Sequence, residues 1–293
     1  MTTPPRQKSF MFDRLAVSPM RWWWAIAVYV VAMVITTVLS YGGLVPGLHW
    51  IGAQSQMVGY FLALPIVLLI FGRKLSRPLG WIALGGRRLG RTLLIGAAYG
   101  LACWIFVGIV QRLLKTGEGG TASLLREGGV GTDVSATIFL LLSIALIAPV
   151  CEEVYFRAGI FRPLRDGFSG GAAVGSTRVL VATIVAFVLS SLAFVSVHGG
   201  GAANAFLLVV LAVFFTLAYL TTSSLTGAVV AHAVNNILTL YGALAAMGNL
   251  AWWVWSLPAA GGIIAIVVSV MLGGVFDKSD NDASIAPART ATV

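Results

Sequence analysis

Charged side chains are scarce in this sequence. They account for 10% of its 293 residues, whereas soluble domains usually carry about 25%. Hydrophobic residues account for 58%, and they fall in runs long enough to cross a bilayer. This balance excludes an ordinary soluble domain and predicts a polytopic integral membrane protein.

Cysteine is almost absent as well. The two cysteines, Cys103 and Cys151, both lie inside apolar runs, so they can build neither a disulfide framework nor a zinc site of cysteines. The HExxH motif of one large group of zinc proteases is also missing. The net charge of +9 does not indicate nucleic acid, because the basic residues lie between apolar runs and not on one arm or helix face. We therefore expect no nucleic acid partner.

The apolar runs predict an all-α bundle of about eight transmembrane helices, because a hydrocarbon core about 30 Å thick needs about 20 helical residues. No internal repeat and no linker-like segment divides the chain. In the third run, Gly96 and Gly100 form a GxxxG pair, which predicts the close approach of a neighbouring helix. The predicted spans are 22–40, 57–72, 92–110, 134–161, 180–198, 206–222, 225–241 and 251–276.

Lysine and arginine set the expected orientation, because cytoplasmic loops carry an excess of both. They gather before the first span, between the second and third, and after the fourth, so we expect both termini in the cytoplasm. The basic run Arg162 to Arg165 is expected on the lipid headgroups. The expected organisation is a cytoplasmic tail (1–21), N-terminal helices (22–131), a core of four helices (132–241), a last helix (242–276) and a flexible polar tail (277–293).

Two adjacent glutamates and an arginine, Glu152, Glu153 and Arg157, follow the uncharged stretch 134–151. A carboxylate at membrane depth costs roughly 2.5 to 3.5 kcal/mol on insertion scales, so residues of this kind indicate a functional site. Glu153 and Arg157 are four residues apart and share one helix face, where they can neutralise each other. Glu152 points about 100° away from Glu153 and is left as the free carboxylate.

The remaining polar residues inside the spans are few. The fifth span ends at His198, with Phe194 one turn before it, and the seventh carries His232 and Asn236, also one turn apart. If they meet, Glu152 and one histidine can hold a water molecule and take its proton. The other histidine and Asn236 can then donate hydrogen bonds to the oxyanion of a tetrahedral intermediate. The set favours a hydrolase, with a peptide bond as its natural target.

In this order, the residues resemble the motifs of the CPBP intramembrane protease family. The pattern is Glu152-Glu153-x-x-x-Arg157, then Phe194-x-x-x-His198, then His232-x-x-x-Asn236, on separate predicted helices. The family comprises the type II CAAX prenyl endopeptidases and the bacteriocin-processing or self-immunity proteins, also called the Abi family. The resemblance covers roughly residues 132–241, and it implies a membrane endopeptidase whose catalytic core is formed by these helices.

The resemblance also implies a role for each residue. Glu152 would be the catalytic base, and His198 would help it to position the water. His232 and Asn236 would form the oxyanion hole. The supporting residues would be Glu153, Arg157 and Phe194. The family is often described as metalloproteases, and Glu152, His198 and His232 could supply three ligands of a divalent metal, zinc above all, with one position left open. A metal-free mechanism in which a glutamate activates water fits the sequence equally well.

Strict alternation of the spans creates one difficulty. It places Glu152 toward the cytoplasmic end of the fourth span and His198 toward the outer end of the fifth, which would hold the two side chains apart. They can meet if the fourth span is long and runs past a kink at Pro149, and if Gly199 to Gly201 break the fifth.

Two other functions compete with a protease. A secondary transporter would also place ionisable residues at mid-membrane, but it favours an inverted repeat, and none is visible. A non-proteolytic scaffold or bacteriocin self-immunity protein of the same fold is the main alternative, although a scaffold has no reason to keep Glu152 and two histidines against their desolvation cost. We expect the substrate to be a membrane-associated peptide or protein, with or without a prenylated CAAX end. We expect the protein itself to lie in a bacterial cell membrane, with membrane lipid as a further partner.

Overall fold

The computed structural model describes residues 21–40, 59, 86–114, 120–198 and 201–284. All regular elements in this part of the chain are helical, and it contains no strand, which confirms the all-α class. Six helices are long and apolar enough to cross a membrane. The predicted count of about eight is approximate. Within the first predicted span, the described apolar stretch covers only Trp23–Ile35, and the second predicted span (57–72) lies, apart from residue 59, outside the described residues.

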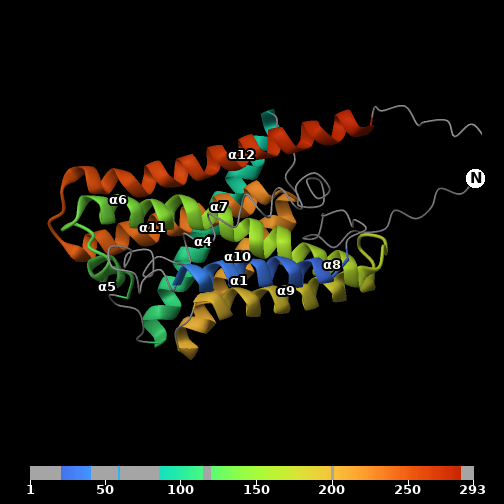
Figure 1. Ribbon diagram of the computed structural model, residues 1–293, viewed down its shortest axis with the longest axis horizontal. Coiled ribbons are helices and arrows are strands. Elements are labelled where there is room, and N and C mark those ends of the chain that lie inside the picture. The colour runs from blue at the N-terminus through green and yellow to red at the C-terminus, as the bar shows by residue number, and fades with distance from the viewer. Residues whose placement is uncertain (1–20, 41–58, 60–85, 115–119, 199–200, 285–293) are drawn as a thin grey trace, which may run out of the picture.

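Figure 1 shows the helices packed into one bundle, with α12 along one edge, α9 along the opposite edge and α4 crossing between them. Two segments, η2 and η3, are π-helical, and η4 is a 3₁₀-helix. The elements are α1 (Trp23–Ser40), α4 (Gly86–Leu114), α5 (Gly120–Glu127), α6 (Val134–Leu142), η2 (Ser143–Ile147), α7 (Ala148–Glu152), η3 (Glu153–Phe161), α8 (Arg162–Ser169), α9 (Thr177–His198), α10 (Ala202–Thr222), α11 (Leu225–Met247), η4 (Trp252–Trp255) and α12 (Ser256–Ser284).

The fourth predicted span is the longest helical stretch among the six, running without a break from Val134 to Ser169. It begins at Asp133, whose side chain accepts a hydrogen bond from the backbone N–H of Ala136, and it ends at Gly170 in the left-handed conformation. At the predicted kink the helix widens into η2 just before Pro149. This widening has a local cause, because proline lacks an N–H and its ring crowds the carbonyl one turn earlier.

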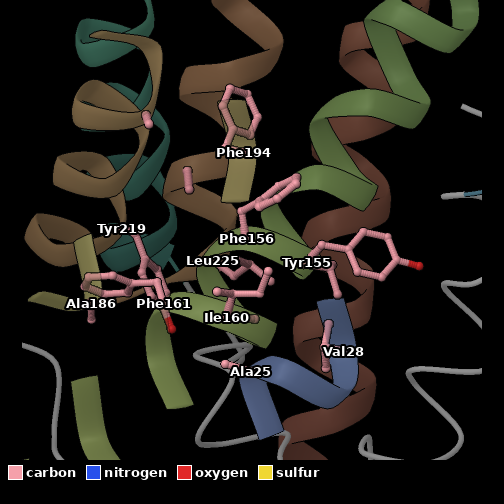
Figure 2. Close-up of a cluster of buried hydrophobic side chains, with 14 of the residues drawn as sticks. Ala25, Val28, Tyr155, Phe156, Ile160, Phe161, Ala186, Phe194, Tyr219 and Leu225 are labelled. Carbon is pink, nitrogen blue, oxygen red and sulfur yellow. The ribbon is translucent and has the colours of Figure 1, made fainter. Parts of the chain in front are cut away.

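Helix α1 packs against η3. Figure 2 shows Ala25 and Val28 of α1 beside Tyr155 and Ile160 of η3, and all four side chains are buried. Gly159 allows the two helices to approach, since a Cβ at this position would lie 2.8 Å from a methyl carbon of Val28. This packing holds η3, which begins with Glu153 and contains Arg157, against the rest of the bundle.

The structure corrects the expected place of the basic run after the fourth span. Arg162 and Arg165 are 3% and 0% exposed, so they do not lie on the lipid headgroups. Both pair with Asp166 at 2.6 Å, and Nε of Arg165 also donates to Thr183 of α9. The reason is that α8 continues the fourth span into the bundle, where the carboxylate of Asp166 pairs with both guanidinium groups.

The last helix runs past the end of the last predicted span. We predicted that it ends at residue 276, but α12 continues to Ser284, into the segment predicted as a flexible tail. Once an apolar run has formed a helix, extending it costs little, because each further residue adds one backbone hydrogen bond. Residues 285–293 lie outside the described part of the chain.

The predicted close approach at Gly96 and Gly100 is present, and the partner helix is α11. A Cβ on Gly96 would lie 2.7 Å from the carbonyl oxygen of Gly227, and one on Gly100 would collide with the carbonyl oxygen of Ala231. Ala231 directly precedes His232. The glycine pair therefore sets how deeply α11 sits in the bundle, and with it the place of His232.

We expect Gly100→Ala to lower stability by about 1–3 kcal/mol, because the added methyl group forces α4 and α11 apart. Gly108→Ala is the matched control on the same helix, since a Cβ there meets nothing within 4 Å. This control should be neutral or gain up to about 1 kcal/mol from helix propensity. Thermal unfolding in detergent measures both, and equal shifts in the two variants would contradict the packing described.

Candidate active site

Three ionisable side chains from three helices meet inside the bundle. Glu152 is the last residue of α7, His198 is the last residue of α9, and His232 lies on α11. Nε2 of His198 is 3.6 Å from Oε1 of Glu152, and Nε2 of His232 is 3.9 Å from Oε2 of the same carboxylate. The structure therefore brings together the glutamate and the two histidines that the sequence singled out.

The length of the fourth span explains how Glu152 and His198 reach the same depth. The eight residues of α8 extend this helix beyond Phe161, which adds about 12 Å at 1.5 Å per residue. Glu152 then lies near the middle of the 36-residue stretch, and the 22 residues of α9 bring His198 back to its level. The sequence also predicted a break at Gly199 to Gly201. Gly201 is the N-cap residue of α10, and residues 199 and 200 lie outside the described part of the chain.

The hydrogen bond of His198 fixes its tautomer. Nδ1 lies 2.7 Å from the backbone carbonyl oxygen of Phe194. A carbonyl oxygen only accepts hydrogen bonds, so Nδ1 must carry a proton. In the neutral imidazole, Nε2 is then unprotonated, and this is the atom that faces Glu152.

His232 is held in the same way, but by a side chain. Its Nδ1 lies 2.8 Å from Oε1 of Glu153, a carboxylate that is fully buried. A carboxylate accepts this hydrogen bond, so Nε2 of His232 is again the atom that faces Glu152. Glu153 was expected only to pair with Arg157, and its bond to His232 gives it a second task in orienting the imidazole.

The predicted ion pair between Glu153 and Arg157 is present. Nε of Arg157 lies 3.1 Å from Oε2 of Glu153, although the angles at this contact do not meet those of a hydrogen bond. The guanidinium carbon lies 5.3 Å from the ring centroid of Phe194 and 5.5 Å from that of Phe215. Arg157 is therefore a buried cation between two aromatic rings, with its charge balanced by Glu153.

Asn236 lies one turn after His232 and is anchored to the fourth span. Its Nδ2 donates to the carbonyl oxygen of Ile144 at 2.9 Å, and its Oδ1 accepts from Nδ2 of Asn235 at 3.2 Å. Ile144 lies in the π-helical segment η2, where the regular α-helical ladder is interrupted. One amide hydrogen of Asn236 is thus used for structure, and the second is the one that could serve an oxyanion.

Sequence reasoning missed two partners of this cluster. The backbone carbonyl of Ile144 could not be singled out, because the π-helical turn that presents it is a property of the folded helix. Phe215, whose ring stacks on His232, stands in the uncharged run of α10. No spacing or polar neighbour distinguishes it there from the other apolar residues.

The donor atoms of the cluster are of a kind that can bind a metal ion. The two Nε2 atoms face one carboxylate, and both Nδ1 atoms are held by acceptors, as is usual for metal-ligating histidines. Among the residues that the structure describes, no group of three histidine, cysteine, aspartate or glutamate side chains stands out as a preformed metal site. We derive no chemical step through a metal, and the zinc site that the resemblance implies stays a prediction.

Membrane-length helices around a buried glutamate and two histidines define a polytopic membrane protein with a candidate hydrolytic centre. Residues 134–238 match the family model of the type II CAAX prenyl endopeptidases, described as Rce1-like, and the chain contains a domain of this family. All residues of the three motifs lie inside the matched range. A comparison with curated proteins and one with solved structures gave no match. The match implies a protease.

Proposed function

We propose that this protein is an intramembrane endopeptidase in which Glu152 activates a water molecule. The observation that carries the proposal is the convergence of two oriented imidazoles on one buried carboxylate. Each Nδ1 is held by an acceptor, so each Nε2 is directed at Glu152. Three groups that can accept a proton face one another here. Acceptors form no hydrogen bond with each other, so a purely structural role does not explain this arrangement.

The distances support a water between these groups. Separations of 3.6 Å and 3.9 Å are too long for direct hydrogen bonds and suit a bridging molecule. A water between Glu152 and His198 would donate one hydrogen to the carboxylate and one to Nε2. Both of its hydrogens then point at the protein, and an oxygen lone pair is left to attack a substrate carbonyl.

Attack on the carbonyl carbon forms the new C–O bond while Glu152 takes a proton from the water. The tetrahedral oxyanion would accept one hydrogen bond from the second amide hydrogen of Asn236 and one from Nε2 of His232, with the imidazole protonated on both ring nitrogens. Glu152 then gives its proton to the leaving amine as the C–N bond breaks. Atoms and charges balance, and no serine or cysteine nucleophile is needed.

A membrane-associated substrate follows from the place of the site. Glu152 is 2% exposed, whereas His198 is 20% exposed, so a peptide can reach the cluster from the end of α9. The family description points to a protein with a prenylated CAAX end, and the apolar helices around the site suit a lipid-linked peptide. The cytoplasmic place of both termini and the bacterial cell membrane stay predictions.

The test of this proposal is cleavage by the purified full-length protein in liposomes. We would offer matched CAAX peptides with and without a prenyl group and analyse the products by mass spectrometry. Cleavage of either peptide at one bond is expected, with preference for the lipidated form. If neither peptide is cut by a well-folded protein, the scaffold or immunity function takes precedence.

Metal dependence can be tested with the same assay. Because Glu152 alone activates the water in the proposed mechanism, we expect the cleavage rate to stay within about twofold after chelation. A chelator at two concentrations, followed by addition of zinc, provides the measurement. Loss of activity that zinc alone restores would contradict this expectation and would assign Glu152, His198 and His232 as the ligands suggested by the resemblance.

A further inference from the structure

Phe215 on α10 is fully buried and lies flat against His232. The two ring centroids are 4.4 Å apart, and the ring planes differ by 17°. This residue lies outside the three sequence motifs. The guanidinium carbon of Arg157 is also close to it, at 5.5 Å from the ring centroid.

The stack supplies a restraint that the hydrogen bond of His232 does not. The bond from Nδ1 to Glu153 fixes one atom of the imidazole, but the ring can still turn about the line of that bond. A flat aromatic surface fixes the plane of the ring. The two restraints together determine where Nε2 points, which is toward Glu152 at 3.9 Å.

His198 also has a hydrogen bond at Nδ1 and an aromatic neighbour, but its ring is tilted by 42° against that neighbour and is not stacked. Its Nδ1 is bound by the carbonyl of Phe194, and its ring packs on the Phe194 ring with centroids 4.2 Å apart. Arg157 contacts both phenyl rings, at 5.3 Å and 5.5 Å. One buried cation therefore braces the aromatic supports of both histidines.

We propose that Phe215 is a positioning residue that sets the plane of the His232 imidazole and so the direction of Nε2 toward Glu152. This inference rests on the proposed function, because the direction of Nε2 matters for catalysis only if the site hydrolyses a peptide bond. Phe215 acts through His232, and we assign it no contact with the substrate.

The kinetic test compares Phe215→Leu, which removes the flat surface, with Phe215→Tyr, which keeps it. We expect kcat to fall by about 10- to 100-fold in Phe215→Leu, since a small misplacement of a catalytic group has effects of this size. KM should stay within about twofold, and Phe215→Tyr should keep most of the activity. Phe161→Leu is the matched control, because Phe161 is equally buried but packs on Tyr219.

A second readout is independent of cleavage. The chain has three histidines, so NMR of ring-labelled histidine in nanodiscs can follow His232, with its signal assigned by loss in His232→Gln. The stacked phenyl ring should shift the His232 ring protons upfield, and Phe215→Leu should remove this shift while Phe161→Leu leaves it. Unchanged His232 signals in Phe215→Leu would overturn the inference, whether or not the protein cleaves peptides. Cleavage that depends on Glu152 but has normal kcat in Phe215→Leu would also overturn it, while the proposed function would stand.

Discussion

Replacing Glu152 with glutamine should lower kcat for peptide cleavage by about 10²- to 10⁴-fold, the usual contribution of a general base. Glutamine has the shape of glutamate but cannot take a proton from water. The side chain is 2% exposed and its contacts are long, so the fold should tolerate the change. Single-turnover cleavage of the preferred peptide gives the rate, and the thermal midpoint of the same sample shows whether the protein is folded.

Glu127→Gln is the control for this experiment. Glu127 is an exposed carboxylate on α5, where it accepts a hydrogen bond from Ser123, so its loss should leave both rate and stability unchanged. Cleavage at the wild-type rate by folded Glu152→Gln protein would show that the carboxylate is not the base. A large loss of thermal stability in this variant would instead indicate a structural role.

Replacing Arg157 with methionine should have the largest effect on stability. Glu153 is fully buried, and without Arg157 its negative charge has no cation beside it. Removing one partner of a buried ion pair typically costs about 3–5 kcal/mol, and the aromatic rings of Phe194 and Phe215 also lose the cation between them. We expect a marked drop in yield and in the thermal midpoint, measured in detergent.

The double variant Glu153→Gln/Arg157→Met separates stability from function. With both charges removed, most of the lost stability should return, because no uncompensated charge is left in the interior. Activity should stay low, since Nδ1 of His232 no longer faces a carboxylate. A double variant no more stable than Arg157→Met would show that the ion pair is not what Arg157 contributes.

Helical spacing predicted the assignment of the two glutamates correctly. Residues four apart share a face, and Arg157 indeed lies against Glu153 and leaves Glu152 for the histidines. The fold class followed from the scarcity of charge, since uncharged apolar runs of about 20 residues are typical of transmembrane helices. These inferences succeeded because each depends on local spacing or on composition.

Contacts between distant segments could not be predicted in the same way. Spacing says nothing of the bond from Glu153 to His232 or of the anchor from Asn236 to Ile144, because each joins residues on different helices. Strict alternation of spans alone would hold Glu152 and His198 apart, since it takes no account of a helix that continues inside the bundle. The same continuation buries Arg165, which the positive-inside rule assigned to the membrane surface.

A water molecule that Glu152 directs at a peptide carbonyl leaves its oxygen in the product. We would cleave one lipidated CAAX peptide in water enriched in heavy oxygen, using wild-type protein and Glu152→Gln side by side, and measure the product masses. We expect one heavy oxygen atom in the new carboxyl group from the wild type, and at least about 100-fold less product from the variant in the same time. Equal product from both proteins, or a peptide fragment covalently attached to the enzyme, would contradict the proposed role of Glu152.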